Sequence, residues 1–407
     1  MKNEANATGI GTGERPYGVL FAILGTVSFT FATYLAIGLS LAVLPGFVHV
    51  TLGYDATLAG LAISMQYVAT LLSRPHVGRM ADALGPKCTV LTGLSLCAVS
   101  GGLLLLGDLA AGRPALSLGL ILLARLALGT AESCVGTGAI AWGMGQVGHH
   151  HTARVISWNG VATYGALAAG APLGVALQHR YGFAVIGIVT MALMLAVLPL
   201  ARRKRATRVA IGERTALRSV AARVLPYGAG LALGSIGFGC IATFVTLFYA
   251  THGWSGAAFA LSVFGVMFVG IRFLFGRSIS RRGGFRVAMF SLVIEAVGLL
   301  LLALAGSAGM ACLGAAVAGV GFSLVFPALG VEAMQRVPEH SRGAALGLYT
   351  VSMDVAMAVV GPLGGWLAGG RGYAAVYTVA AGAAVAAAVL AMVLQVQARA
   401  AAGEGVG

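Results

Sequence analysis

Three of the charged residues inside long apolar runs are candidates for chemistry, because a charge in a membrane-spanning segment is costly. Arg125 and Glu132 are seven residues apart in one run, and Asp354 lies twelve residues after Arg342 in another. In helices, Arg125 and Glu132 lie on nearly one face, ~10 Å apart, and Asp354 lies ~18 Å into its run, near the middle of a bilayer. Each charge costs roughly 2.5–3.5 kcal/mol in hydrocarbon. A carboxyl group in an apolar cavity can take up a proton and release it elsewhere, so these residues are candidates for proton coupling; the alternative is a static polar contact between helices.

The other chemistry-bearing residues do not converge on an enzyme or a metal site. Five cysteines lie in or at the ends of apolar runs without a CxxC pair, which is typical of buried thiols. The three consecutive residues His149–His151 have poor geometry for a closed metal site. No GxxxxGK[ST] motif offers a nucleotide site. We expect no enzyme activity, no metal, and no cofactor besides the proton as coupling ion.

Composition places this chain in a membrane. It is 58% hydrophobic and only 9% charged, with a mean hydropathy of +0.92, whereas soluble proteins are about 25% charged. Twelve apolar runs are long enough to cross ~30 Å of hydrocarbon as helices. They begin at about Val19, Thr57, Cys88, Ala115, Val155, Phe183, Val224, Ala257, Val287, Ala308, Gly343 and Tyr373. The sequence predicts an all-α integral membrane protein with twelve transmembrane helices.

The chain contains an internal repeat. The stretch Arg74–Lys87 aligns with Arg272–Arg286 at an offset of 198, and both are expected to be tight polar loops between apolar helices. Two related halves predict two pseudo-symmetric six-helix bundles and favour a transporter. The expected segments are an N-terminal tail (1–18), a first bundle (19–201), a basic linker (202–223), a second bundle (224–397) and a C-terminal tail (398–407).

The distribution of basic residues predicts the orientation. With the N-terminus inside, most of the 26 Lys and Arg lie in cytoplasmic segments, including the central linker. The outer loops carry Arg113, Arg180 and Arg371. Both termini are therefore expected in the cytoplasm, and the net charge of +14 is explained by topology and by attraction to the anionic leaflet rather than by nucleic acid.

One predicted loop carries a family resemblance. The sequence GRMADALGPK, residues 78–87, resembles the signature loop of the major facilitator superfamily, between its second and third helices. The chain departs from that pattern at Ala83 and Pro86, where the family usually has basic residues. The resemblance implies a cytoplasmic gate that latches the two halves. Its residues here would be Gly78, Arg79, Asp82, Gly85 and Lys87.

Further motifs narrow the resemblance. Residues 125–129, RLALG, look like the RxxxG motif of proton-coupled members, and GALAAGAPLG at 165–174 resembles the antiporter motif of exporters, with a fuller version in span eleven. The antiporter-like residues are Gly165, Gly170, Pro172, Gly174, Gly361, Pro362, Gly364 and Gly365. The chain also resembles the drug/proton-antiporter-like, arabinose-efflux-type permeases of bacteria. This resemblance lies in the residues from Glu132-Ser133 to Trp142, in residues 157–160 and in Tyr164.

The resemblance also implies a central cavity lined by spans one, four, seven and ten, with spans two, five, eight and eleven alongside. The nominated cavity residues are Tyr34, Gln66, Trp158, Asn159, Tyr164, Phe238 and Phe244. Aromatic faces with a few hydrogen-bonding groups suit a small amphipathic solute; ordinary packing is the alternative.

We therefore expect a monomeric secondary transporter of the bacterial inner membrane that exports a small organic solute, such as a drug, a sugar or a metallophore-like compound, by proton antiport. The alternatives are proton-coupled uptake and a non-transporting membrane receptor.

Overall fold

A computed structural model describes residues 16–148, 151–207, 217–338 and 342–403. Twelve of its helices are long and apolar enough to cross a membrane, so the predicted all-α membrane fold is confirmed. The first half contains α1 (Pro16–Leu41), α2 (Leu44–Gly46), η1 (Phe47–Thr51), α3 (Ala56–Leu84), α4 (Pro86–Leu109), α5 (Pro114–Val147), α6 (Thr152–Tyr181) and α7 (Ala184–Arg203). The second contains α8 (Leu217–Thr251), α9 (Ala257–Phe275), α10 (Ser278–Arg282), α11 (Gly284–Ala303), α12 (Ala308–Phe322), α13 (Val325–Met334), α14 (Arg342–Arg371) and α15 (Tyr373–Gly403).

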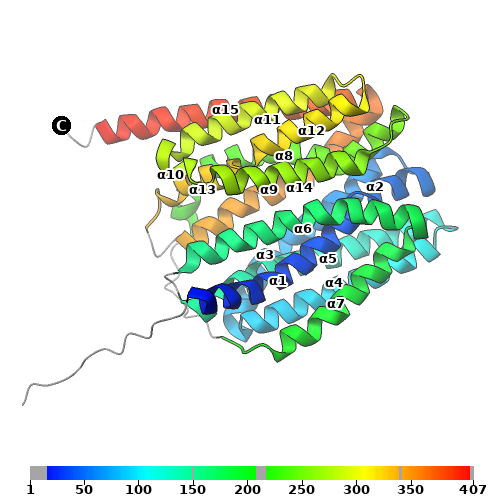
Figure 1. Ribbon diagram of the computed structural model, residues 1–407, viewed down its shortest axis with the longest axis horizontal. Coiled ribbons are helices and arrows are strands. Elements are labelled where there is room, and N and C mark those ends of the chain that lie inside the picture. The colour runs from blue at the N-terminus through cyan, green and yellow to red at the C-terminus, as the bar shows by residue number, and fades with distance from the viewer. Residues whose placement is uncertain (1–15, 149–150, 208–216, 339–341, 404–407) are drawn as a thin grey trace, which may run out of the picture.

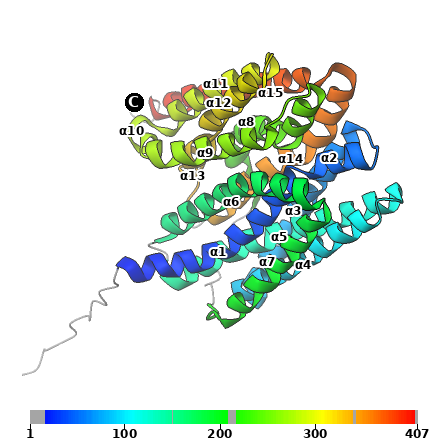
Figure 2. The ribbon, with the colours of Figure 1, turned by 45° about the vertical axis from the view of Figure 1, so that its right-hand side comes forward.

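The two halves form two bundles that pack side by side (Figures 1 and 2). Within the first, α4 packs on α5 and α7, and α1 packs on α6; within the second, α11 packs on α12 and α15, and α8 packs on α15. The most extensive contacts between the bundles are those of α3 with α14 and of α6 with α9. The first helix begins and the last helix ends at one end of the molecule, which we call the termini side; the other end is the opposite side.

The repeated stretches are helical rather than loops, which corrects the sequence interpretation. Helix α3 continues through Gly78, Arg79 and Asp82 to Leu84, and the chain reverses at the single residue Gly85, with φ +89°. In the second copy the reversal is at Gly283, with φ +83°. These values fall in a region that favours glycine, so one residue is enough to turn the chain. The helical extension carries Arg74 into the body of the molecule.

The start of the central linker packs against the first bundle on the termini side. Trp142 donates from Nε1 to the carbonyl of Arg205 (2.9 Å), and Lys87 donates from Nζ to the carbonyl of Arg202 (2.7 Å). The ammonium of Lys204 lies 5.9 Å from the ring centroid of Phe29, and its partial burial lowers the pKa of this lysine. The predicted linker, 202–223, overlaps the ends of α7 and α8, and residues 208–216 lie outside the described part.

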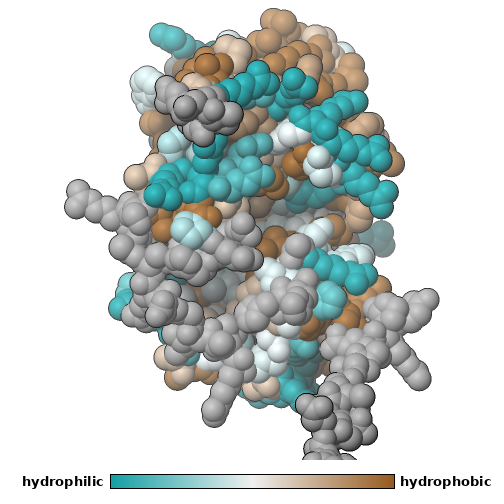
Figure 3. All heavy atoms as spheres, turned by 90° about the vertical axis from the view of Figure 1, so that its left-hand side faces the viewer, coloured by the Kyte–Doolittle hydropathy of each residue, from teal (hydrophilic) through white to brown (hydrophobic). Residues whose placement is uncertain are grey.

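Seen from the termini side, the molecule presents many hydrophilic side chains beside apolar flanks (Figure 3). Arg79 and Asp82 are exposed there. The predicted gate role of the group Gly78, Arg79, Asp82, Gly85 and Lys87 stays a prediction. Its described polar contact is that of Lys87, which joins the start of α4 to the end of α7 and lies within the first bundle. The terminal residues 1–15 and 404–407, and His149 and His150, are outside the described residues.

Candidate functional site

Glu132 lies in a hydrogen-bonded cluster inside the first bundle. Its side chain on α5 is 7% exposed and accepts from Tyr34 Oη on α1 (3.0 Å) and from Gln66 Nε2 on α3 (2.7 Å). Tyr34 donates to Oε1 of Glu132 and Gln66 to Oε2, and Thr70 Oγ1 lies 3.3 Å from Oε2. Gly129 permits this arrangement, because a side chain at this position would collide with the backbone of Gln66 and separate α5 from α3. Two donors, on α1 and α3, thus hold the carboxylate of α5 in one position, while the hydroxyl group of Thr70 lies closer to the carbonyl oxygens of Gln66 and Gly129 (3.0 Å each).

Asp354 forms an ion pair across the bundle interface. Arg74 on α3 donates from Nε to Asp354 Oδ2 on α14, at 2.5 Å. The side chain of Asp354 is 9% exposed and that of Arg74 is 27% exposed. Sequence reasoning missed Arg74, because the expected loop placed it outside the membrane. The signal was present in the repeat, which aligns Arg74 with a second arginine, Arg272.

The two carboxylates are electrostatically linked through Arg74. Its charge interacts with Asp354, Tyr34 and Glu132, and the charges of Glu132 and Asp354 interact with each other. Glu132 belongs to the first bundle and Asp354 to the second. Arg74 thus contacts the carboxylate of one bundle directly and interacts at longer range with that of the other.

Arg125 does not pair with Glu132 in the described structure. It is fully buried and donates from Nη1 to Ser40 Oγ on α1 (2.9 Å). Its Nε and Nη2 have no protein partner among the described residues. Arg125 therefore bonds α5 to α1, and its role in proton coupling, which would act on Glu132 through space, stays a prediction.

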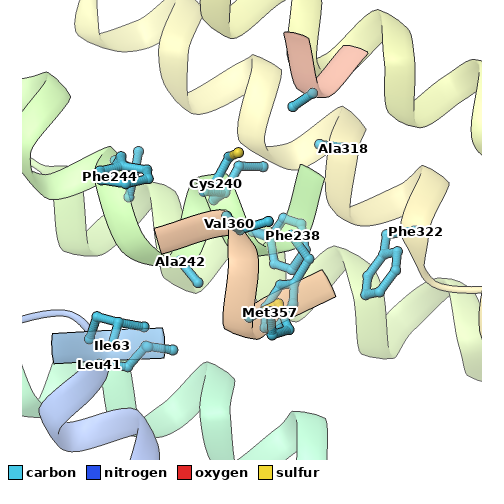
Figure 4. Close-up of a cluster of buried hydrophobic side chains, with 14 of the residues drawn as sticks. Leu41, Ile63, Phe238, Cys240, Ala242, Phe244, Ala318, Phe322, Met357 and Val360 are labelled. Atoms are coloured by element: carbon cyan, nitrogen blue, oxygen red, sulfur yellow. The ribbon is translucent and has the colours of Figure 1, made fainter. Parts of the chain in front are cut away.

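An apolar cavity of about 30 Å³ lies between the bundles toward the opposite side. Tyr164 on α6 and Phe268 on α9 line it, with their ring centroids 4.1 Å apart and their planes tilted by 36°, and Phe238 also lines its wall. Figure 4 shows Leu41 and Ile63 of the first bundle facing Phe238 and Ala242 of the second. Organic ligands need pockets of ~300–1,000 Å³, so the bundles are closed around this cavity.

The structure brings some predicted cavity residues together and separates others. Tyr34 and Gln66 contact Glu132, and Asn159 accepts through Oδ1 from Thr30 Oγ1 (2.8 Å). Trp158 packs instead against an apolar cluster formed by α1, α5 and α6. Phe244 is fully buried inside the second bundle, where its ring faces Tyr373. Trp158 and Phe244 thus lie in packing positions, since aromatic type alone does not say which side of a helix faces the cavity.

The antiporter-like glycines sit mainly at close helix contacts. A methyl group at Gly170 or Gly174 would collide with the backbone of α1, and one at Gly361 or Gly365 with that of α3. Gly364 faces the ring of Phe244, Gly165 has open space beside it, and Pro172 and Pro362 lie inside helices. Ser64 adds polar bonds at the α3–α14 contact, where it donates to the carbonyl of Met357 (3.0 Å) and accepts from the amide of Gly361 (3.1 Å). The opposite side is therefore closed by backbone contact.

We predict that Gly60→Ala reduces transport at least ~10-fold. An added methyl group would collide with the backbone of Gly361, and the bundles would have to separate at the contact that closes the opposite side. Flux into liposomes and the melting temperature measure the effect. Gly102→Ala on α4, where an added methyl group meets nothing within 4 Å, is the matched control. Equal activity of the two variants would contradict the proposed closure.

Glu295 is a buried carboxylate enclosed within one bundle. It is 1% exposed on α11, and neither of its carboxylate oxygens has a hydrogen-bond partner in the described part of the chain. Gly237 of α8 and Gly321 of α12 lie against it. Because rigid-body motion of the two bundles does not open the interior of either one, Glu295 is poorly placed to exchange protons between the two sides.

We predict that Glu295→Gln retains proton-coupled transport within about twofold. The amide has the shape of the carboxyl group and removes the cost of an uncompensated charge. Proton flux in liposomes is the measurement. A loss comparable to that of a substitution at Glu132 would show that Glu295 carries protons.

Two helical bundles with charged residues at their interface are typical of membrane transport proteins. The model of the Major Facilitator Superfamily matches residues 26–288 and 275–405. An uncharacterized MFS-type transporter of Burkholderia pseudomallei (strain K96243) is 56% identical over 362 residues, 89% of each chain. The MFS-type transporter YhhS of Escherichia coli (strain K12) is 51% identical over 360 residues, 88% of this chain and 89% of that one. The chain belongs to the major facilitator superfamily and is a transporter of that type.

Solved structures agree on the fold. The nucleoside transporter NupG has a TM-score of 0.74 at 16% identity, over 91% of this chain and 99% of that chain. The human organic anion transporter MFSD10 (TETRAN) has a TM-score of 0.64 at 18% identity, over 93% and 100%. At such identities the likeness concerns the fold alone.

Proposed function

We propose that this protein exports a small organic solute by proton antiport and alternating access. The observation that carries the proposal is the pair of carboxylates on the two bundles, Glu132 and Asp354, linked through Arg74 at the interface. Charged groups inside a membrane are expensive and generally functional. The small cavity toward the opposite side and the glycine contacts describe a state closed on that side.

A proton on Asp354 would weaken the bond to Arg74, because a neutral carboxyl group attracts a guanidinium less than a carboxylate does. For antiport, Asp354 would take up this proton while the opposite side is open and lose it toward the termini side, where the ion pair between α3 and α14 forms again in the closed state. Glu132, held by Tyr34 and Gln66, would take up or release its proton as the interface changes. Inward proton flow thus drives outward solute flow.

Proton-coupled uptake is the second candidate, since the same carboxylates would serve it. The close-packed glycines of α6 and α14, which resemble the antiporter motif, favour export. A non-transporting receptor is a poorer fit, because it has no need for two linked intramembrane carboxylates.

We place the protein in the bacterial inner membrane, as a monomer with the termini side facing the cytoplasm. The basic residues support this orientation: Arg79, Lys87, Arg202, Arg281 and Arg282 all lie on the termini side. The partners are then the bilayer, protons and a small-molecule substrate.

The test uses the purified protein in liposomes that contain a pH dye. Candidate solutes are added against a proton gradient, and proton movement is recorded with each. Solute-dependent proton entry opposite to the solute supports antiport. Proton movement in the same direction as the solute would support uptake, and solute flux without proton movement would overturn coupling.

A further inference from the structure

Arg272 crosses the bundle interface but has no acidic partner. It extends from α9 against α6, where its guanidinium carbon lies 5.4 Å from the ring centroid of Tyr164, and it lies 5.1 Å from that of Phe268 on its own helix. A side chain at Gly160 would lie 3.0 Å from Nη1 of this arginine. No carboxylate of the described residues pairs with it, and no hydrogen bond from it occurs among them.

The internal repeat shows which partner this position lacks. Arg74 and Arg272 differ by 198 positions, as do the turn glycines Gly85 and Gly283 that follow them. The two arginines therefore occupy equivalent positions on α3 and α9. Each reaches across the interface to the other bundle.

The helices that receive the two arginines are also equivalent. Pro172 and Pro362 differ by 190 positions, and so do Gly182 and Gly372, which end the two helices with φ +83° and +79°. At this offset Tyr164 aligns with Asp354. One arginine thus meets a carboxylate, and the equivalent arginine meets a phenol ring.

We infer that Arg272 forms a binding site for the anionic group of the transported solute, a carboxylate or phosphate-type oxyanion. This inference rests on the proposed transport function and names its substrate class. Stacking on aromatic rings holds the guanidinium plane and leaves its N–H edge free to bind an oxyanion in a forked geometry. The solute would supply the negative charge that Asp354 supplies to Arg74.

The position of Arg272 fits this role. It lies beside Tyr164 and Phe268, which line the apolar cavity, so an anionic group at Arg272 leaves an attached apolar ring close to aromatic side chains. Arg272 is only partly buried, whereas Arg125 is sealed at 0% exposure. Arg272 thus keeps exposed surface that a solute can contact.

The test measures binding to the purified protein in nanodiscs of phosphatidylcholine. The probes are benzoate and phenyl phosphate, with benzamide as the neutral control, at constant ionic strength. Bound anions should raise the melting temperature in a saturable way, and benzamide should not. Arg272→Gln and Tyr164→Asp are each expected to weaken binding at least ~10-fold, the second because the new carboxylate would occupy Arg272 from within. Arg272→Lys should bind with intermediate strength.

One matched variant is expected to bind like the wild type, within about threefold: Arg281→Gln removes an exposed arginine of α10 that lies outside the proposed site. Tyr164→Phe keeps the aromatic ring beside Arg272 and should bind more strongly than Tyr164→Asp. Three results would overturn the anion site. They are equal stabilisation by benzamide, unchanged affinity in Arg272→Gln, and no stabilisation by either anion at 10 mM, a concentration of about 10⁻² M that also detects weak sites. Stabilisation that appears only with phosphatidylglycerol in the discs, and depends on Arg272, would assign the anion to lipid and overturn it as well. If anion binding fails in one of these ways while proton-coupled solute flux is still measured in liposomes, the proposed transport function stands and only the anion site is lost.

Discussion

Glu132→Gln is expected to reduce proton-coupled transport at least about 100-fold, as expected when a group that transfers protons is removed. The amide is nearly isosteric with the carboxyl group. Its oxygen can take the place of Oε2 and accept from Gln66, and its NH2 group can donate to the hydroxyl oxygen of Tyr34, but it cannot gain or lose a proton. The cluster should therefore persist while coupling is lost. Downhill exchange of solute between two equal pH compartments should continue, since that process needs no net proton movement.

The measurement compares uphill and downhill flux in the same liposomes. Glu295→Gln is the control, because it makes the same chemical change at a buried carboxylate enclosed by α8, α11 and α12. If Glu132→Gln still drives solute uphill on a proton gradient, Glu132 is structural. If it abolishes downhill exchange as well, its role is in binding or folding rather than in coupling.

The fold was largely predictable because lipid imposes strong constraints. Every backbone polar group must be satisfied within the membrane, so a long apolar run becomes a helix. The run beginning near Ala257, for example, corresponds to α9, which begins at Ala257, and the last run corresponds to α15, which begins at Tyr373. The ends of helices were less predictable. The polar stretch Arg74–Lys87 between two apolar runs was expected to be a loop, yet α3 continues to Leu84, because the helix extends beyond the hydrocarbon.

The candidate site was predictable only in part. A charge within an apolar run is visible in one dimension, so Glu132 and Asp354 could be nominated from the sequence. Their partners could not, because Arg74 and Asp354 are 280 residues apart and meet only through tertiary packing. Spacing on one helix favoured Arg125 as the neighbour of Glu132, but the arginine turns to Ser40 on α1. Which way a side chain turns is decided by the adjoining helix.

Removing one partner of the pair between Arg74 and Asp354 is expected to destabilise the protein more than removing both. Loss of one member of a buried ion pair costs about 3–5 kcal/mol, since the other charge is left uncompensated. Arg74 is 27% exposed, so solvent screens part of this cost and we expect the lower end of that range or less. The variants to compare by their melting temperatures are Asp354→Asn, Arg74→Gln and the double variant.

The double variant separates structure from coupling. Two neutral amides can bond to each other across the α3–α14 interface, so its melting temperature should recover toward that of the wild type, and the double-mutant cycle should show a clear interaction energy. Coupled flux should stay lost, because the proton acceptor at position 354 is gone. Recovery of coupled flux together with stability would mean that Asp354 serves only to hold Arg74. Additive losses in the cycle would mean that the two residues do not act as a pair, and the link between the bundles at Asp354 would have to be abandoned.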